Sequence, residues 1–237
     1  MKIWDNFQQH FGNAFRLVLR EIEGSTGREA WGTCTVFSDD AVRFVVTAQH
    51  VVKRPPRTYV TVPGEDTFPW PSAHSVLQPV STGVPDADVA WARAVAKDED
   101  TSLAGGIPIG LAQLRVPISS ELSYLAVGFP SSKAKVRHGA AQSKARLMLA
   151  AVQLASVEVS KSLGLDDRVH CAFTYKRDVR LDLDGRQLQG AEPHGMSGGV
   201  VLALFTAGPE QSGTPPIPVI VGILTEYHEK CEALVAT

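Results

Sequence analysis

The sequence has little of what membrane, secreted or metal-binding proteins require. Among 237 residues only three are cysteine, and no apolar run reaches the length that crosses a bilayer. Residues 1–20 include Asp5 and other polar side chains ahead of any apolar run, so they lack the hydrophobic region and small-residue cleavage site of a secretory signal. We therefore expect a protein that begins at Met1, has no membrane association and works in the cytoplasm.

The cysteines and histidines give no indication of a bound metal. Cys34, Cys171 and Cys231 are an odd number of thiols, and none is spaced with a histidine as zinc ligands usually are. We expect all three to be reduced thiols, and we expect neither a metal nor a cofactor. Cys34 stays open as an alternative nucleophile, although no histidine motif better than the one at His50 would serve it.

The charge of the chain is close to balanced. The formal net charge is −2 at pH 7 and the pI is about 6.4, which gives no electrostatic basis for nucleic-acid binding. Hydrophobic residues make up 44% of the chain and charged residues 20%, as in globular proteins with a buried core. Lysines and arginines gather between residues 131 and 146; a solvated loop is the default explanation, and a site for an acidic partner stays open.

Three short strings carry most of the functional information: TAQHVV around His50, DVAWA from Asp88 and GMSGG around Ser197. A serine hydroxyl is a weak nucleophile, and an imidazole that takes up its proton activates it. A carboxylate behind the imidazole fixes the tautomer of the ring and stabilises the imidazolium. We therefore predict Ser197 as the nucleophile, His50 as the general base and Asp88 as its partner. Asp86 competes with Asp88, but only Asp88 directly precedes an apolar segment.

The residues around Ser197 also predict a site for the negative charge that forms on an attacked carbonyl oxygen. Gly195, Gly198 and Gly199 allow a tight turn in which the backbone N–H groups of Gly195 and Ser197 can point at one spot. Pro193 has no N–H and cannot contribute. We predict Gly195 and Ser197 as the oxyanion hole.

At these residues the chain resembles the trypsin/chymotrypsin family of serine peptidases, and within it the bacterial HtrA-like (Deg-like) and related intracellular trypsin-like peptidases. The matching signatures are Thr47-Ala48-Gln49-His50, Asp88-Val89-Ala90-Trp91 and Gly195-Met196-Ser197-Gly198-Gly199. Each string alone is short enough to occur by chance. The chain order of histidine, aspartate and serine, however, is that of trypsin and differs from the orders in subtilisins and α/β-hydrolases. Softer matches lie at residues 32–37, 127–130 and 221–225.

The resemblance implies an all-β fold of two six-stranded antiparallel β-barrels. His50 and Asp88 would come from the first barrel and Ser197 from the second, with the site in the cleft between them. The implied activity is that of a serine endopeptidase acting on protein or peptide substrates through an acyl-enzyme. The resemblance also assigns Thr225 to the position of a serine that usually hydrogen-bonds the catalytic aspartate.

By the same resemblance, the substrate pocket is bordered by residues just before the serine loop and on the strand after it: Ala191, Glu192, Thr225, Glu226 and Tyr227. The acidic pair of Glu192 and Glu226 would favour a basic substrate side chain. Ala191 at the base would instead favour a small or apolar one. Both preferences stay open.

Apolar periodicity predicts how the chain is organised. Trp4, Phe7, Phe11 and Phe15 recur at helical spacing and predict an amphipathic N-terminal helix that packs against the body. We expect three regions: the N-terminal helix and first strand entry over 1–20, the first barrel over 21–115, and the second barrel over 116–237. Strands are predicted in the first barrel at 15–23, 31–37, 42–47, 58–62, 75–79 and 89–94. In the second barrel they are predicted at 124–128, 144–153, 156–159, 171–175, 200–205 and 219–224.

Two alternatives to a general peptidase stay open. One is a catalytically silent trypsin-like module that binds a protein partner through the same cleft, which Met196 in the serine loop and Thr225 favour. The other is a peptidase that cuts one dedicated partner or depends on an activator, because no domain of the PDZ type follows the second barrel.

Overall fold

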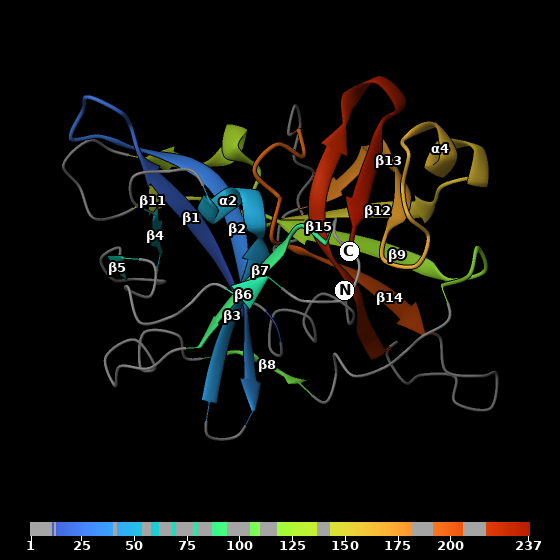
Figure 1. Cartoon of the computed structure of the whole chain (residues 1–237), viewed down its shortest axis with the longest axis horizontal. Helices are drawn as coiled ribbons and strands as arrows, with labels where there is room; N and C mark the ends of the chain where they lie inside the picture. Colours follow the sequence, from blue (N-terminus) through green and yellow to red (C-terminus); the bar gives the residue numbers. More distant parts are fainter. Residues whose placement is uncertain are drawn as a thin grey trace.

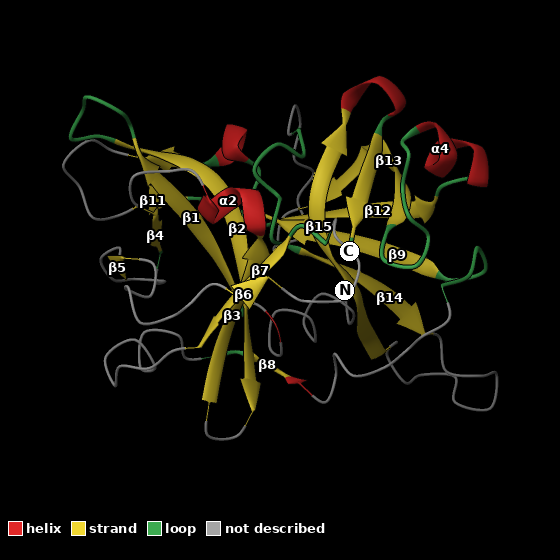
Figure 2. Cartoon of the chain, viewed as in Figure 1, coloured by secondary structure: helices red, strands yellow, loops and turns green. Residues whose placement is uncertain are grey.

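The structure is a computed structural model in which strands dominate. It describes residues 11, 13–39, 42–53, 58–61, 68–69, 78–79, 87–93, 105–109, 118–136, 143–181, 192–205 and 217–237. The strands of the N-terminal half and those of the C-terminal half form two bodies that lie side by side (Figure 1). Short helices lie at the ends of strands (Figure 2).

The first body is one curled sheet. Its strands run in the order β5-β4-β1-β2-β3-β7-β6, with β8 parallel to β2 and every other pair antiparallel. The strands are β1 (Phe15–Glu21), β2 (Arg28–Asp39), β3 (Val42–Ala48), β4 (Thr58–Val60), β5 (Phe68–Pro69), β6 (Gln78–Pro79), β7 (Val89–Arg93) and β8 (Ile107–Pro108). Within the described residues β5 and β6 are its free edges, so this sheet stays open and does not form the six-stranded closed barrel that we predicted.

The second body is a closed barrel of six strands in the order β12-β13-β16-β15-β14-β9, as predicted for this half. Its strands are β9 (Ser123–Gly128), β12 (Met148–Leu154), β13 (Cys171–Leu181), β14 (Val200–Phe205), β15 (Ile217–His228) and β16 (Ala233–Ala236). A separate small ribbon pairs β10 (Lys135–Val136) with β11 (Ser143–Lys144). The predicted boundary at 115–116 between the two halves lies outside the described residues.

One helix corrects a prediction. Residues 156–159, predicted as a strand, include the start of α4 (Val157–Ser162), because Ser156 caps this helix by accepting a hydrogen bond from Val159 N. Most of the predicted N-terminal helix lies outside the described residues, and strand β1 begins at Phe15, where a strand over 15–23 was predicted. The other helical segments among the described residues are α2 (Gln49–Lys53), η2 (Ser131–Lys133) and η4 (Glu229–Cys231).

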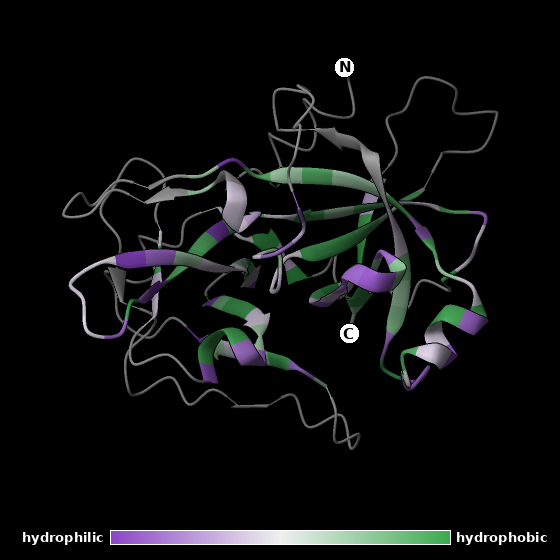
Figure 3. Ribbon diagram, turned by 90° about the horizontal axis from the view of Figure 1, so that it is seen from above, coloured by the Kyte–Doolittle hydropathy of each residue, from purple (hydrophilic) through white to green (hydrophobic). Residues whose placement is uncertain are grey.

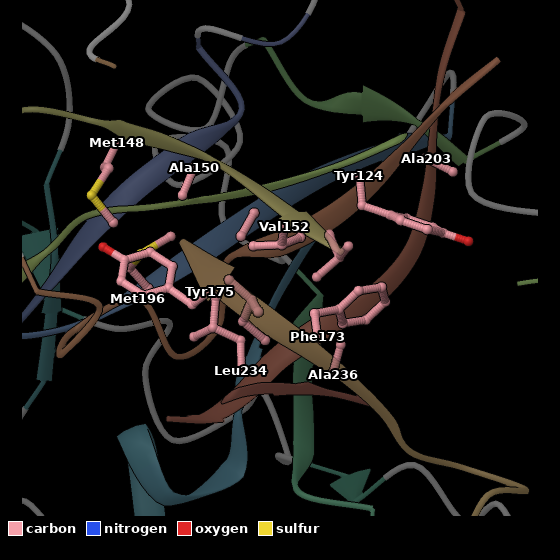
Figure 4. Packing of buried hydrophobic residues seen from close by; sticks show 13 residues of the cluster. Tyr124, Met148, Ala150, Val152, Phe173, Tyr175, Met196, Ala203, Leu234 and Ala236 are labelled. Atoms are coloured by element: carbon pink, nitrogen blue, oxygen red, sulfur yellow. The ribbon is translucent and has the colours of Figure 1, made fainter. Parts of the chain in front are cut away.

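The second barrel buries side chains on both faces of its strands. Because successive side chains of a strand point to opposite faces, Val201 and Ala203 of β14 pack inside the barrel, while Val200 and Leu202 pack toward the first sheet. Inside the barrel, Figure 4 shows Tyr124, Phe173, Tyr175, Met196 and Leu234 gathered into one cluster. The edge of one ring faces another where Tyr124 meets Phe173, with ring centroids 5.1 Å apart.

A second cluster joins the two bodies. It combines residues of the first sheet with residues of the barrel: Phe15, Phe37, Val89 and Ile107 from the former, and Val127, Leu149, Val200, Leu202, Ile220 and Ile223 from the latter. Figure 3 shows green, hydrophobic stretches along strands of both bodies, whereas purple, hydrophilic stretches lie mainly on helices, turns and the ends of strands. This shared cluster fixes the sheet that holds His50 against the barrel that holds Ser197.

In the part of the chain that is described, no helix is both long enough and apolar enough to cross a membrane. The same residues contain no group of three or more histidine, cysteine, aspartate or glutamate side chains arranged to hold a metal ion.

Candidate functional site

Strand pairing brings His50 and Asp88 to one edge of the first sheet. β3 ends at Ala48 and leads directly into α2, which carries His50, while Asp88 immediately precedes β7. The two strands are antiparallel, and Ala48 pairs with Val89. The end of β3 therefore meets the start of β7, which sets the two side chains next to each other.

Asp88 has two structural roles at this edge. Its Oδ1 accepts a hydrogen bond of 2.9 Å from His50 N, and its backbone carbonyl accepts one of 3.0 Å from Gln49 N. These N–H groups lie in the first turn of α2, where no partner exists within the helix. Asp88 thus caps the short helix that carries His50 and fixes where that helix begins.

The second carboxylate oxygen of Asp88 meets the imidazole. Oδ2 lies 2.5 Å from His50 Nδ1, and the His50 side chain is 45% exposed, against 25% for Asp88. A carboxylate at Nδ1 keeps the proton of the neutral ring on that nitrogen, so Nε2 carries the lone pair that can accept a proton. Asp86, the competing candidate, lies outside the described residues.

The serine loop contains two glycines with left-handed backbone conformation. Gly195 and Gly198 both have φ of 91°, a region that residues with side chains seldom occupy. A Cβ on Gly195 would lie 2.7 Å from Ser131 N, and one on Gly198 would lie 1.9 Å from the Thr33 carbonyl oxygen. The glycine pattern that drew attention to this loop in the sequence is therefore required by both conformation and space.

The backbone of this loop turns the N–H groups of Gly195 and Ser197 away from the partners of the neighbouring carbonyls. The His194 carbonyl accepts hydrogen bonds from Ser131 N (2.7 Å) and Ser131 Oγ (3.1 Å), and the Met196 carbonyl accepts one from Gly199 N (2.8 Å). The C=O and N–H of a trans peptide point in opposite directions, so the N–H groups of Gly195 and Ser197 face away from these partners. Neither N–H has a hydrogen-bond partner among the described residues. Two neighbouring donors without a partner are what an oxyanion site requires.

The Ser197 hydroxyl has a different partner from the one that the sequence predicts. Its Oγ donates a hydrogen bond of 3.0 Å to the Thr225 carbonyl, and within the described residues no hydrogen bond joins it to His50. To bond with the imidazole, the hydroxyl must give up the Thr225 carbonyl. The hydroxyl of Thr225 does not reach Asp88 either, because it donates to the Val235 carbonyl at 3.3 Å.

His50, Gly195 and Ser197 line one cleft of about 300 Å³ between the two bodies. Of the residues predicted to border the substrate pocket, Glu226 and Tyr227 line this cleft. Thr225 is buried behind it, and Glu192 approaches the rim residue His194 at 4.0 Å. Ala191 lies outside the described residues.

Several cleft residues were not identified from the sequence. The wall opposite the serine loop includes Arg20, whose guanidinium lies 3.2 Å from the ring centroid of Trp31 and 2.6 Å from Glu29 Oε1. The floor of the cleft includes the buried side chains of Leu224 and Leu234. Trp31 directly precedes the small-residue segment at 32–37, which was the one sequence signal that pointed to this wall.

The alternative nucleophile does not fit the structure. Cys34 is fully buried on β2, and desolvation raises the pKa of its thiol to about 12. A thiol with that pKa is protonated at neutral pH, whereas the thiolate is the reactive form. Cys34 therefore acts as a packing residue.

Comparison with known proteins finds similarity in fold and none in sequence family. No protein-family model matches the chain, and no curated protein matches it. Among solved structures, the serine endoprotease from Yersinia pestis superposes with a TM-score of 0.53 and 14% identity, over 98% of this chain and 61% of that one. The tobacco vein mottling virus protease superposes with a TM-score of 0.52 and 12% identity, over 97% of this chain and 78% of that one.

The chain thus spans about three fifths of the length of the Yersinia structure. The similarity covers both bodies, so it extends to the open first sheet as well as to the closed barrel. At this level of identity the likeness concerns the fold alone, and the chain has the fold of the trypsin-like serine proteases.

Proposed function

We propose that the chain is a serine endopeptidase that hydrolyses peptide bonds in a restricted set of protein substrates. The observation that supports this most strongly is the 2.5 Å contact between His50 Nδ1 and Asp88 Oδ2 on the cleft that also contains Ser197. The unpaired N–H groups of Gly195 and Ser197 add donors for a developing negative charge beside the same serine.

In the proposed reaction, Ser197 Oγ releases the Thr225 carbonyl and attacks the carbonyl carbon of the substrate peptide. His50 Nε2 takes the hydroxyl proton, and Asp88 stabilises the imidazolium through Nδ1. The N–H groups of Gly195 and Ser197 bind the oxyanion of the tetrahedral intermediate. His50 then gives the proton to the leaving amine, and water, activated by His50, hydrolyses the acyl-enzyme.

The proposal is tested with a fluorophosphonate probe, which forms a covalent bond with an activated serine. We expect the wild type to be labelled and Ser197→Ala to show no labelling, with an unchanged circular-dichroism spectrum. Ser162→Ala on α4 is the matched control, because its hydroxyl only bonds the Val159 carbonyl within the helix. Labelling that persists in Ser197→Ala would assign the activity to another nucleophile.

A catalytically silent module that binds a protein partner through the cleft is the second candidate. One observation favours it: the Ser197 hydroxyl is bonded to the Thr225 carbonyl and not to His50. A folded wild type that the probe never labels would support this candidate and exclude the peptidase.

The cleft offers two kinds of recognition to a substrate side chain. Glu226 has a carboxylate side chain that is 53% exposed, lies 2.8 Å from His228 Nε2 and suits a basic group, whereas the buried Leu224 and Leu234 add apolar lining. A digest of a peptide library, read by mass spectrometry, decides which of the two sets the cleavage preference.

A further inference from the structure

Thr33 is a fully buried residue of β2 that belongs to the first sheet but bonds mainly to the second body. We infer that Thr33 is a positioning residue, which holds the oxyanion N–H groups in place through two carbonyls of the serine loop. This inference rests on the proposed peptidase function. It extends that function to a residue that does not itself touch the substrate.

Both polar groups of Thr33 that can reach the loop bind it directly. Thr33 N donates a hydrogen bond of 2.8 Å to the Ser197 carbonyl, and Thr33 Oγ1 donates one of 2.9 Å to the Gly195 carbonyl. The same Oγ1 accepts a hydrogen bond of 2.8 Å from Phe129 N. The Thr33 carbonyl in turn accepts a bond of 2.7 Å from Thr47 Oγ1, which ties Thr33 to β3.

These bonds fix the peptide units that flank the oxyanion donors. The Gly195–Met196 peptide is held at one end by Thr33 and at the other by the bond of 2.9 Å from Met196 N to the Pro193 carbonyl. The Ser197–Gly198 peptide is held by Thr33 N and by the bond of 2.7 Å from Gly198 N to the Leu224 carbonyl. The N–H groups of Gly195 and Ser197 lie in the peptide units directly before these two. The directions of both N–H groups therefore depend on these hydrogen bonds.

Gly195 needs hydrogen bonds from other residues to hold its backbone conformation. A glycine at φ of 91° has no Cβ to restrict rotation about its own bonds, and the conformation is one of several that it can adopt. Ser131 holds the peptide before Gly195 through the His194 carbonyl, and the hydrogen bond from Thr33 to the Gly195 carbonyl fixes the peptide after it, so both sides of the glycine are held. Donors that are already aimed at the developing charge need no rearrangement during the reaction.

The hydroxyl of Thr33 therefore provides a contact that no apolar isostere replaces. Thr33→Val keeps the shape of the side chain but removes the donor to the Gly195 carbonyl and the acceptor for Phe129 N. Thr33→Ser retains both hydrogen-bonding functions. Thr35→Val is the matched control, because Thr35 is equally buried on the same strand and its Oγ1 bonds the Gly198 carbonyl, beyond the serine, at 3.0 Å.

The first test compares steady-state kinetics on one peptide substrate. We expect Thr33→Val to lower kcat about tenfold or more, with KM within about twofold of wild type, because the lost interaction acts on the transition state. Thr33→Ser and Thr35→Val should each retain kcat within about threefold. Thr33→Val removes two described hydrogen bonds and Thr35→Val one, so the free energy of unfolding of both variants is measured beside kcat. Equal kcat values in Thr33→Val and Thr35→Val would show that the role is only structural.

The second test does not depend on activity. In amide hydrogen exchange measured by NMR, Thr33→Val should accelerate exchange at Met196 by about tenfold or more, because that N–H belongs to the peptide unit that Thr33 holds. Thr35→Val should accelerate exchange at Gly199 instead, whose N–H shares a peptide with the Gly198 carbonyl. Unchanged exchange at Met196 would overturn the inference.

The two tests separate the possible failures. A wild type with no activity would refute the proposed function, while the exchange rates at Met196 would still decide whether Thr33 holds the loop. An active wild type with unaltered kcat in Thr33→Val would refute the inference alone. If Thr33→Val does not fold, Thr33→Ala replaces it in both tests. This variant removes the same hydroxyl without adding a methyl group near the loop.

Discussion

At the scale of single residues, Gly198 has the least room for change. It has φ of 91°, and a Cβ there would lie 1.9 Å from the Thr33 carbonyl oxygen and 2.2 Å from Thr47 Oγ1. We expect Gly198→Ala to lower the free energy of unfolding by about 3 kcal/mol or more, because backbone strain and a clash with fixed atoms add together. Chemical denaturation measures this loss.

Gly24 provides the control for that prediction. It also has positive φ, at 73°, but no atom lies within 4 Å of a Cβ built on it. Gly24→Ala should therefore lower the free energy of unfolding only through the strained backbone conformation, by about 1–2 kcal/mol. If both variants lower the free energy of unfolding by the same amount, the close approach of Thr33 to Gly198 adds nothing to the cost of the substitution.

The sequence predicts which residues lie near one another better than it predicts their hydrogen bonds. The fixed order of the three strings predicted that His50, Asp88 and Ser197 converge; His50 and Ser197 line one cleft, and the contact between His50 and Asp88 follows from neighbouring strands. The partner of the Ser197 hydroxyl could not be predicted, because the Thr225 carbonyl reaches it through the fold of another strand. The role of Thr33 was hidden for the same reason, since its hydrogen bonds cross between the two halves.

At the scale of secondary-structure elements, α4 shows where local pattern misleads. The alternation of apolar and polar residues in Val157-Glu158-Val159-Ser160 is typical of a strand. The structure forms a helix there, because Ser156 caps its N-terminus and Glu158 lies in its first turn, where a negative charge is favourable. Strand β16 was not predicted from the sequence. Its four apolar residues, Ala233–Ala236, are too few to show a period.

The loop after α4 yields a prediction about pH. Arg168 Nε lies 2.9 Å and Nη2 2.5 Å from the carboxylate of Asp166, and these bonds lower the pKa of Asp166 to about 2. The charged form is favoured in the folded state, so the associated stability is present above the unfolded pKa of about 3.9 and is lost as the pH falls toward about 2. We expect Arg168→Ala to raise the pKa of Asp166 toward its ordinary value.

A carbon-13 NMR titration of the Asp166 carboxyl group measures this shift. Lys161→Ala, which removes a positive charge from α4 but no bond to Asp166, is the control and should leave the titration unchanged. A low pKa that persists in Arg168→Ala would mean that backbone N–H groups, and not the guanidinium, hold the carboxylate in its charged form.

At the scale of the whole molecule, the site depends on the packing of the two bodies. His50 and Asp88 come from the first sheet and Ser197 from the barrel, and the cluster that includes Val127 fills the space between them. We expect Val127→Ala to cost about 2 kcal/mol of unfolding free energy. It should also lower kcat about tenfold, since small displacements of reacting groups are costly.

Val201 is the matched control for the interface. It is a fully buried valine on the strand next to Val127, but it packs inside the barrel. Val201→Ala should lose similar stability while keeping kcat within about threefold. If kcat falls equally in both variants, the decrease in kcat results from the loss of stability and not from a change in the relative position of the two bodies.

The overall architecture could be predicted only in part. The apolar runs predicted strands in both halves, and the resemblance to the trypsin-like peptidases implied two β bodies with the site between them. Closure was predicted for both, but only the second closes, because its six strands pair in a complete ring. In the first sheet, β5 and β6 have two residues each among the described residues, and such short edges leave no clear alternation in the sequence.

The division of the site between the two bodies also bears on how the protein is made. Ribosomes deliver the N-terminal half first, and domains generally fold as they emerge. His50 and Asp88 thus emerge before Ser197 has been synthesised, and the serine loop meets Thr33 only when the second body docks. In the peptidase proposed above, a nascent chain that carries only the first body would have no nucleophile with which to cleave its neighbours.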